Sequence, residues 1–243
     1  MMKHTKLQDF EVTRYSKPIK AMKLADDDEL IHVDMHEKPN ILSLSKIGYA
    51  LRFRTADLSL YGLHAGGVKS MSLSECDHVA AVLYVNPSDD FVILTSRGHV
   101  IKDVVEELPI YNRNRRGILV IDHQKTNPHF AVSGARLSKQ QQKENVEVRI
   151  VTEEGSLMLT VNDMKYSGNK FGKKLFDEEA LGKGFIIQVF DAKEDDLDLK
   201  IAKLPPKKTP NPTEDIDLKE EVVTVDDKKI HLNRLDLFDE DDE

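Results

Sequence analysis

The sequence predicts an all-β protein of about four repeated units, each with about four short strands, arranged like the blades of a propeller. Three observations predict this fold: short segments in which apolar and polar residues alternate, glycine-containing turns between them, and a recurrence of the pattern about every 50 residues. A single blade cannot bury its apolar face alone, so neighbouring units are expected to pack against one another.

The alternation of apolar and polar residues identifies the expected strands. Residues 49–54 (YALRFR) and 146–151 (VEVRIV) alternate as half-buried strands do. Residues 91–101 are typical of a strand, a turn containing Gly98, and a second strand, and Gly155 marks the same kind of turn. The polar segment 139–145 (KQQQKEN) interrupts the pattern and is interpreted as an insertion.

The repeat is anchored on pairs of positions nineteen residues apart. These pairs are Gly48 and Gly67, Gly98 and Gly117, and Gly155 and Lys174, with Pro18 as the anchor of an earlier unit. The expected units are about 1–38, 39–88, 89–137 and 146–192, within one domain of residues 1–200. The opening glycine of the first unit would fall before Met1, so this unit is expected to lack its leading strand and to form an incomplete blade.

Several columns of the repeat share one residue type. The position after the anchor is apolar, the position sixteen residues before it is apolar, and the position fifteen residues after it is valine in all four units. The members are Ile19, Val68, Ile118 and Leu175, then Met2, Leu51, Ile101 and Met158, and then Val33, Val82, Val132 and Val189.

The net charge of −8 is concentrated at the C-terminal end of the chain. Residues 191–243 contain 18 acidic and 9 basic residues, whereas the remainder is close to neutral. Residues 203–243 are expected to form a proline-containing linker and a disordered acidic tail. This tail is predicted either to compete with a polyanion for the basic loops or only to aid solubility.

Basic residues recur near the anchors, and equivalent loops of successive blades are expected to lie along one rim. Four places before the anchor stand Arg14, Leu63, Arg113 and Lys170. Cations spaced along a curved rim suit a phosphate backbone that follows it, with affinity that depends on salt and not on base sequence. The predicted DNA-binding residues are Arg14, Lys17, Lys20, Lys69, Arg113, Arg115, Arg116, Lys170, Lys173 and Lys174.

Two segments resemble a known family. Residues 48–54 with 66–73 and Asp77 are similar to a blade of the C-terminal domain found in the A subunits of bacterial type IIA topoisomerases. Residues 12–24 (VTRYSKPIKAMKL) resemble the topoisomerase IV protein more than the gyrase protein. The Gln-Arg-Arg-Gly-Gly type of box typical of gyrase is absent, and the nearest string is residues 112–117 (NRNRRG).

The resemblance implies a β-pinwheel that binds and bends double-stranded DNA around its basic rim. It implies that the DNA is presented to a type II topoisomerase core for supercoil relaxation or decatenation, and that the partners are the catalytic core and the ATPase subunit. ATP and Mg²⁺ would belong to other parts of that holoenzyme, and no cofactor is expected in this chain. The catalytic tyrosine of the family lies in a different domain, so none of the six tyrosines is assigned that role.

The rival hypothesis is a propeller-like scaffold that binds proteins and not DNA, and a third is a marginally folded gene remnant. No catalytic constellation emerges, and no metal site is expected, because the residues 32–36 (HVDMH) are better explained as an exposed strand face. No apolar run reaches the roughly 18 residues that a membrane span needs. The single cysteine, Cys76, favours a reducing compartment, and the family implies a cytoplasmic, nucleoid-associated location.

Overall fold

The computed structural model describes most of the first 189 residues and a short hairpin near the C-terminus. The described residues are 1–11, 18–26, 28–35, 38–122, 128–152, 155–168, 170–176, 185–189, 222–225 and 228–231. The chain divides into two compact parts, residues 1–197 and 198–243. The predicted disorder of the acidic tail therefore lies largely outside the described residues.

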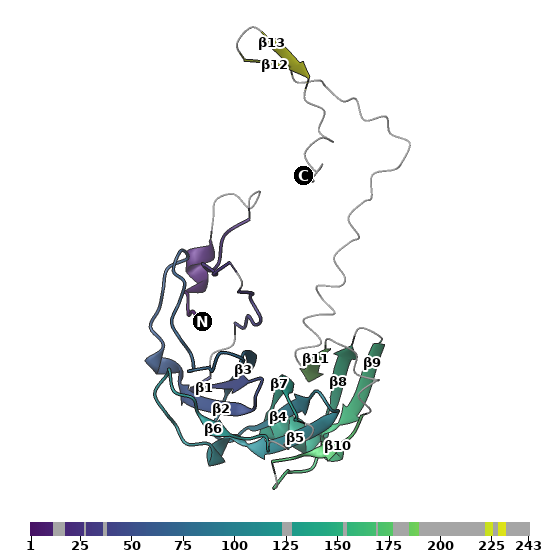
Figure 1. The fold of residues 1–243 in the computed structure, drawn as a ribbon. Coiled ribbons are helices and arrows are strands. Elements are labelled where there is room, and N and C mark those ends of the chain that lie inside the picture. Colours follow the sequence, from purple (N-terminus) through teal and green to yellow (C-terminus); the bar gives the residue numbers. More distant parts are fainter. Residues whose placement is uncertain are drawn as a thin grey trace. The chain divides into compact units, whose positions relative to one another are not determined.

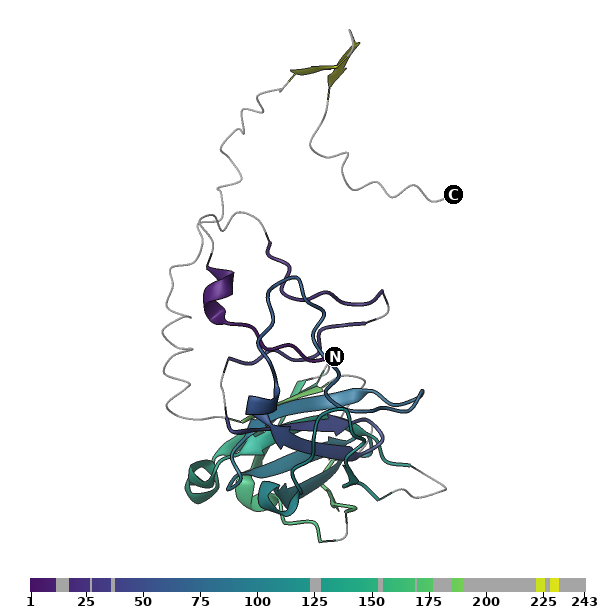
Figure 2. The same cartoon turned by 90° about the vertical axis from the view of Figure 1, so that its left-hand side faces the viewer.

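Residues 1–197 contain three antiparallel sheets, which follow one another in chain order (Figures 1 and 2). The first sheet has the order β3-β1-β2-β6, the second β10-β5-β4-β7, and the third β11-β8-β9. The strands of the first sheet are β1 (Asn40–Ser45), β2 (Tyr49–Arg54), β3 (Val79–Val85) and β6 (Ile118–Leu119). Those of the second are β4 (Asp90–Thr95), β5 (His99–Val104), β7 (Ala131–Leu137) and β10 (Lys173–Lys174). Those of the third are β8 (Glu147–Thr152), β9 (Gly155–Thr160) and β11 (Phe185–Val189).

Short helices connect the strands. Each β-hairpin is followed by a single 3₁₀ turn, η2 (Thr55–Asp57), η3 (Val105–Glu107) or η4 (Val161–Asp163), and η1 (Leu7–Phe10) lies near the N-terminus. The polar insertion forms the helix α1 (Lys139–Glu144), which Ser138 and Gln141 begin with a reciprocal capping box. Within residues 198–243, β12 (Val222–Val225) pairs with β13 (Lys228–His231).

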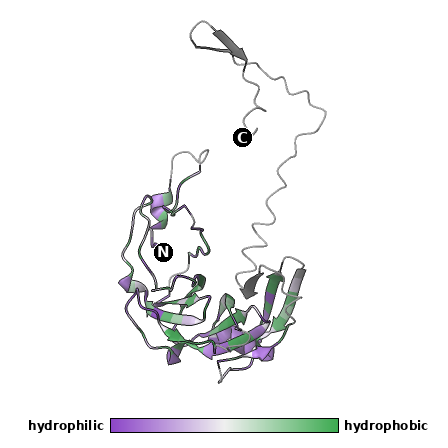
Figure 3. Ribbon diagram, in the orientation of Figure 1, coloured by the Kyte–Doolittle hydropathy of each residue, from purple (hydrophilic) through white to green (hydrophobic). Residues whose placement is uncertain are grey.

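The core lies between the sheets, and apolar residues gather along their strands (Figure 3). The central strands β1 and β4 are buried along their whole length, because side chains on both of their faces are covered. Phe53 and Phe91 are among the largest fully buried side chains. Burial of such a side chain contributes about 1.5–3 kcal/mol. The expectation of an all-β, propeller-like β-pinwheel is confirmed.

Neighbouring units exchange a short strand. β6 comes from the third unit but completes the sheet of the second unit, where Ile118 pairs with Ala50. β10 of the fourth unit pairs in the same way with β5, where Lys173 lies opposite Val100. An exchanged strand ties each unit to the one before it, so the order of the units in space is fixed by backbone hydrogen bonds.

This exchange corrects the predicted anchor of the fourth unit. Gly172 has a φ of +73°, as Gly117 has a φ of +86°, and each immediately precedes its exchanged strand. The counterpart of Gly117 is therefore Gly172 and not Lys174. Because Gly172 lies only seventeen residues after Gly155, the nineteen-residue spacing places the prediction two residues too late.

Two of the predicted repeat columns are also wrong in part: the valine fifteen residues after the anchor and the apolar residue sixteen residues before it. Val82 lies opposite Ser43 in its sheet, and the equivalent positions are Gly134 opposite Ile93 and Ile187 opposite Ile150. The shared valine is therefore not one structural position, because the third unit has two more residues between its anchor and its last strand. In the column before the anchor, Leu51 and Ile101 are equivalent, since their neighbours Ala50 and Val100 both pair with exchanged strands. The counterpart of Ala50 in the first unit, however, is Met2, which pairs with Val68.

The described residues of the first unit, within 1–35, contain η1 and isolated bridges but no named strand. Met2 bridges to Val68 and His4 bridges to Leu60, both of which belong to the second unit. The described part of the chain contains no helix with the length and apolar character needed to cross a membrane.

Candidate nucleic-acid interface

Three equivalent backbone hydrogen bonds place successive loops side by side. The N–H of Lys23 donates to the carbonyl of Ala65 at 3.4 Å, that of Ser72 donates to Arg115 at 2.9 Å, and that of Asp122 donates to Lys170 at 2.9 Å. Each bond joins the segment after one anchor to the loop before the next anchor. The loops that carry the predicted cations are therefore adjacent along the chain of units.

These hydrogen bonds change which basic residues occupy equivalent positions in successive units. The prediction aligns Lys170 with Arg113, whereas the hydrogen bonds make Lys170 equivalent to Arg115 and to Ala65. The reason is the two-residue shift of the fourth anchor. In this column the second unit has alanine, and the third and fourth units have an exposed cation.

Residues 112–117, here called the arginine loop, form the densest group of cations. Arg115 and Arg116 are exposed, and Arg113 is half-buried. One shallow hollow is lined by this loop together with Ser72, and a second is lined by Lys69, Asp57 and residues 112–114. Four of the predicted DNA-binding residues therefore line two adjoining hollows.

Arg113 holds the loop in place. Its guanidinium donates to the carbonyl of Lys69 at 3.0 Å and, at 3.3 Å, to the carbonyl of Asp57. The N–H of Asn114, which has a φ of +60°, donates to the carbonyl of Ser70 at 2.9 Å. Since these contacts use backbone oxygens, they leave the positive charge of Arg113 without a carboxylate partner among them.

Arg116 is oriented by an aromatic ring that the sequence analysis missed. The guanidinium carbon lies 4.4 Å from the centre of the Tyr49 ring, in cation–π geometry. Tyr49 directly follows Gly48 at the start of β2 and faces the exchanged strand at Leu119. An aromatic residue beside the opening glycine of a unit is the sequence signal that could have identified it.

The cations of the fourth unit lie on and beside β10. Lys170, Lys173 and Lys174 are exposed. The pKa of Asp163 lies below its ordinary value, first because the backbone N–H and the hydroxyl of Thr160 donate to its carboxylate, and in smaller part because of the charge of Lys173. Lys173 is thus partly compensated by an acid.

The remaining predicted residues are less well placed by the structure. Lys20 is exposed, and among the described residues no hydrogen bond or ion pair places it against the arginine loop. Arg14 and Lys17 lie outside the described residues. Lys3, which was not predicted, donates to the carbonyls of Ala21 and Leu63, both at 2.6 Å, and so joins the first two units.

Two further cations are buried, of which Arg52 acts between units and Lys102 acts within one. Arg52 donates to the carbonyls of Val105 and Leu108 at 2.9 and 3.0 Å, and burial lowers the pKa of its guanidinium. Lys102 lies 3.6 Å from the carboxylate of Asp90. Within the described residues no group of three or more His, Cys, Asp and Glu side chains could hold a metal ion.

Comparison with known proteins shows which proteins the chain resembles. The family described as "DNA gyrase C-terminal domain, beta-propeller" matches residues 1–37 and 39–86. The chain is 33% identical to the A subunit of DNA topoisomerase 4 from Bacillus subtilis (strain 168) over 190 residues, which is 75% of this chain and 22% of that protein. A crystal structure of the C-terminal domain of DNA topoisomerase IV superposes with a TM-score of 0.71 at 26% identity, covering 82% of this chain and 62% of that one.

In sequence and in fold, the chain is similar to the C-terminal domains of topoisomerase A subunits. The A subunit of DNA topoisomerase 4 from Staphylococcus epidermidis (strain ATCC 12228 / FDA PCI 1200) is 37% identical over 136 residues, 56% of this chain and 17% of that protein. The chain spans about a fifth of the length of these curated relatives. The family resemblance inferred from the residues is confirmed.

Proposed function

We propose that residues 1–197 bind the phosphate backbone of double-stranded DNA along the loops that precede the exchanged strands. The observation that carries the proposal is the series of three inter-unit hydrogen bonds, which sets these loops side by side with Arg115, Arg116 and Lys170 exposed. Contacts of this kind read charge and backbone shape, so affinity falls steeply with salt and depends little on base sequence.

We further propose that the bound DNA is bent and presented to a type IIA topoisomerase core in the bacterial cytoplasm. The similarity to the A subunit of DNA topoisomerase 4 supports this role, as does the placement of cations on successive units and not on one loop alone. In this proposal the chemistry of strand passage, with its ATP and Mg²⁺, belongs to the catalytic core and the ATPase subunit.

A salt titration with matched variants tests DNA binding. Arg115→Ala with Arg116→Ala removes two exposed cations from the arginine loop, and Lys139→Ala with Lys143→Ala removes two from the exposed face of α1. Affinity for a short duplex is measured by fluorescence anisotropy between about 50 and 200 mM salt. The loop variant should lower the slope of log K against log [salt] by about 0.9 for each phosphate that is no longer neutralised, and the α1 variant should leave it unchanged.

Two outcomes would contradict the proposal. Equal effects of the two variants would mean that only net charge matters and not the loop. No binding of the unaltered chain at low salt would favour the rival hypothesis, in which the units form a scaffold for proteins. DNA circularisation with short fragments then tests bending separately. Binding without faster ring closure would contradict the proposed bending and leave the proposed binding intact.

A further inference from the structure

We propose that successive units also present apolar side chains to the bound duplex, and that these side chains pack against the deoxyribose edges of its backbone. The three residues, here called the apolar row, are Leu60, Ile110 and Tyr166. The inference rests on the proposed function, because it concerns the same duplex. It adds to that function a contribution to affinity that does not depend on salt.

The members of the apolar row occupy one position of the repeat. Each makes a parallel bridge to the unit before it, from Leu60 to His4, from Ile110 to Arg52 and from Tyr166 to Lys102. The N–H of the next residue then donates to the carbonyl of the same partner, from Tyr61 and Tyr111 at 2.8 Å and from Ser167 at 3.0 Å. The backbone therefore places residues 60, 110 and 166 equivalently in three successive units.

Each member of the row lies at the start of a loop whose end is fixed on the same strand. Ile110 lies beside Arg52, and Ile118, where the loop ends, pairs with Ala50 of the same β2. The other two loops are held in the same way, with Leu60 and Val68 beside His4 and Met2, and with Tyr166 and Lys173 beside Lys102 and Val100. Two residues of a strand span roughly 7 Å. The start and the end of each loop are therefore close neighbours.

All three side chains of the row are large and exposed. The exposed fractions of Leu60, Ile110 and Tyr166 are 51, 45 and 57%. One exposed apolar side chain is ordinary on a protein surface, whereas its recurrence at the same position of three units indicates a shared contact. The ring of Tyr166 is held against the surface, since the ammonium of Lys102 lies 4.5 Å from its centre and its hydroxyl donates to Asp90 at 2.6 Å.

The neighbouring cations indicate which ligand the apolar row fits. Tyr111 directly follows Ile110 and lines one hollow together with Arg115 and Arg116. A ligand that fills this place must offer negative charge to the guanidinium groups and apolar surface to Ile110. The backbone of DNA offers both, because its phosphates alternate with deoxyribose rings whose C–H edges are apolar. The occupant is therefore a sugar beside a contacted phosphate.

A salt titration of the 243-residue chain separates the apolar row from the cations. Ile110→Ser should lower the affinity for a short duplex about three- to tenfold at every salt concentration between about 50 and 200 mM. The slope of log K against log [salt] should stay unchanged, because a lost apolar contact alters no counterion release. Ile110→Val should keep most of the affinity. A slope lowered as much as in Arg115→Ala with Arg116→Ala would mean that Ile110 only supports the arginine loop, and would overturn the proposal.

Leu60→Ser gives the sharper test. The loop that follows Leu60, residues 61–67 (YGLHAGG), contains no lysine or arginine, so displaced loop cations cannot explain a loss of affinity. Leu60→Ser should also lower the affinity about three- to tenfold with an unchanged slope. Combining it with Ile110→Ser should multiply the two losses, since the residues belong to different units. Unchanged affinity in both single variants would overturn the proposal.

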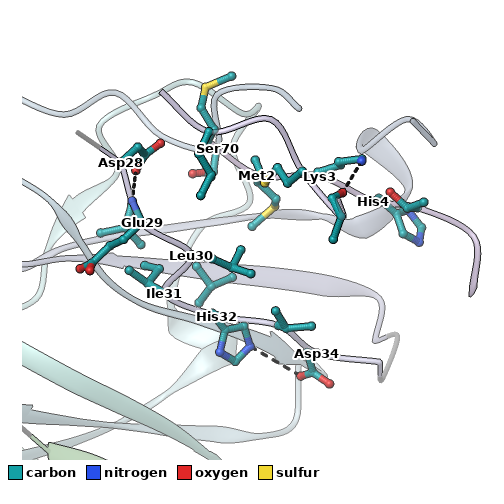
Figure 4. Close-up of a pocket in the computed structure, with 18 of the residues that line it drawn as sticks. Met2, Lys3, His4, Asp28, Glu29, Leu30, Ile31, His32, Asp34 and Ser70 are labelled. Atoms are coloured by element: carbon teal, nitrogen blue, oxygen red, sulfur yellow. Dashed lines mark hydrogen bonds and ion pairs between the residues drawn. The ribbon is translucent and has the colours of Figure 1, made fainter. Parts of the chain in front are cut away.

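Ile31→Ser is the matched control. Ile31 is 51% exposed, as Leu60 is, but it lines a cavity together with Met2 and residues of β3 (Figure 4). β3 forms the edge of its sheet opposite β6. Ile31→Ser should therefore leave the affinity for the duplex unchanged. Thermal unfolding checks that each variant is folded at the temperature of the titration. Equal losses in Ile31→Ser and Leu60→Ser would mean that position does not matter, and would overturn the proposal.

Two other occupants give different results. If the row binds a protein or a second copy of this chain, Leu60→Ser and Ile110→Ser leave the duplex affinity unchanged, and either case overturns the proposal. Analytical ultracentrifugation identifies the second copy by self-association that the two variants remove. A slope that responds to the arginine loop, together with unchanged affinity in both variants of the row, would refute this inference and leave the proposed function standing. No binding of the unaltered chain at low salt would refute both.

Discussion

The substitution Gly117→Ala tests whether the exchanged strand β6 holds the arginine loop. Gly117 lies between that loop and β6, with a φ of +86°. A Cβ atom added there would lie 2.2 Å from the carbonyl oxygen of Ala50 and 2.7 Å from its carbon. Both atoms belong to the backbone of β2, so no side-chain rotation relieves the contact.

The cost follows from two contributions. A non-glycine residue in the left-handed region costs roughly 1–2 kcal/mol. Relief of the clash requires β6 to move away from β2, which breaks backbone hydrogen bonds near Ile118 at about 1 kcal/mol each. With two such bonds broken, the free energy of unfolding should fall by about 3–4 kcal/mol. For a protein of this size, the melting temperature should fall by about 6–16 °C, at roughly 2–4 °C per kcal/mol.

Thermal and urea unfolding measure this loss, with Gly62→Ala as the control. A Cβ atom at Gly62 meets no heavy atom within 4 Å, and its φ is not in the left-handed region. Gly62→Ala should therefore change stability by less than about 1 kcal/mol. The duplex affinity of Gly117→Ala, measured well below its melting temperature, should also fall because Arg115 and Arg116 lose their fixed position. Equal stabilities of the two variants would refute the role of the exchanged strand.

Three further predictions concern contacts between and within units. Lys102→Met should lower the free energy of unfolding by about 3–5 kcal/mol in urea unfolding, because it leaves the buried carboxylate of Asp90 without its cation; a loss below about 1 kcal/mol would refute this. Burial, together with the hydrogen bond that its hydroxyl donates to Asp90 at 2.6 Å, raises the pKa of Tyr166 to about 12. The unfolded chain loses this proton near the ordinary value of about 10, so this contribution to stability is complete below pH 10 and is lost as the pH rises towards 12. An ultraviolet titration should show one tyrosine ionising late, and Tyr166→Phe should remove it; a titration unchanged by Tyr166→Phe would contradict the assignment. Ser138→Ala removes the side-chain cap that accepts from Gln141 at 3.2 Å and should cost about 1 kcal/mol, measured by urea unfolding, whereas an unchanged midpoint would show that α1 needs no cap.

The strands were predictable because their chemistry is local. Residues 49–54 alternate as a half-buried strand does, and the structure places β2 there with the same bounds, although residues 50–53 are buried on both faces of the strand. The turn at Gly98 was predictable for the same reason, since its φ of +72° suits glycine. Local pattern therefore determines the hairpins, and their number and order follow from the repeat.

The exchanged strands and the anchor position of the fourth unit were not predictable from the local sequence pattern. β6 contains only Ile118 and Leu119, too few residues to alternate, and its partner lies about 70 residues earlier in the chain. In the fourth unit, Lys174 fits the nineteen-residue spacing, whereas Gly172 has the positive φ that the anchor position requires. A glycine that must accept a positive φ was the better anchor, and weighing residue type above spacing would have found it.

The inter-unit hydrogen bonds separate the geometry of the candidate interface from its charge. They join backbone atoms, so the loop of the second unit keeps its place although Ala65 stands where the next units have Arg115 and Lys170. A cation can therefore be added or removed in one unit without moving the next loop. Affinity for DNA should then change stepwise with the number of exposed cations while stability stays constant. Arg113 is the exception, because its guanidinium also holds the loop through the carbonyl of Lys69. Replacing it should lower both affinity and stability, and replacing Arg115 should lower affinity alone.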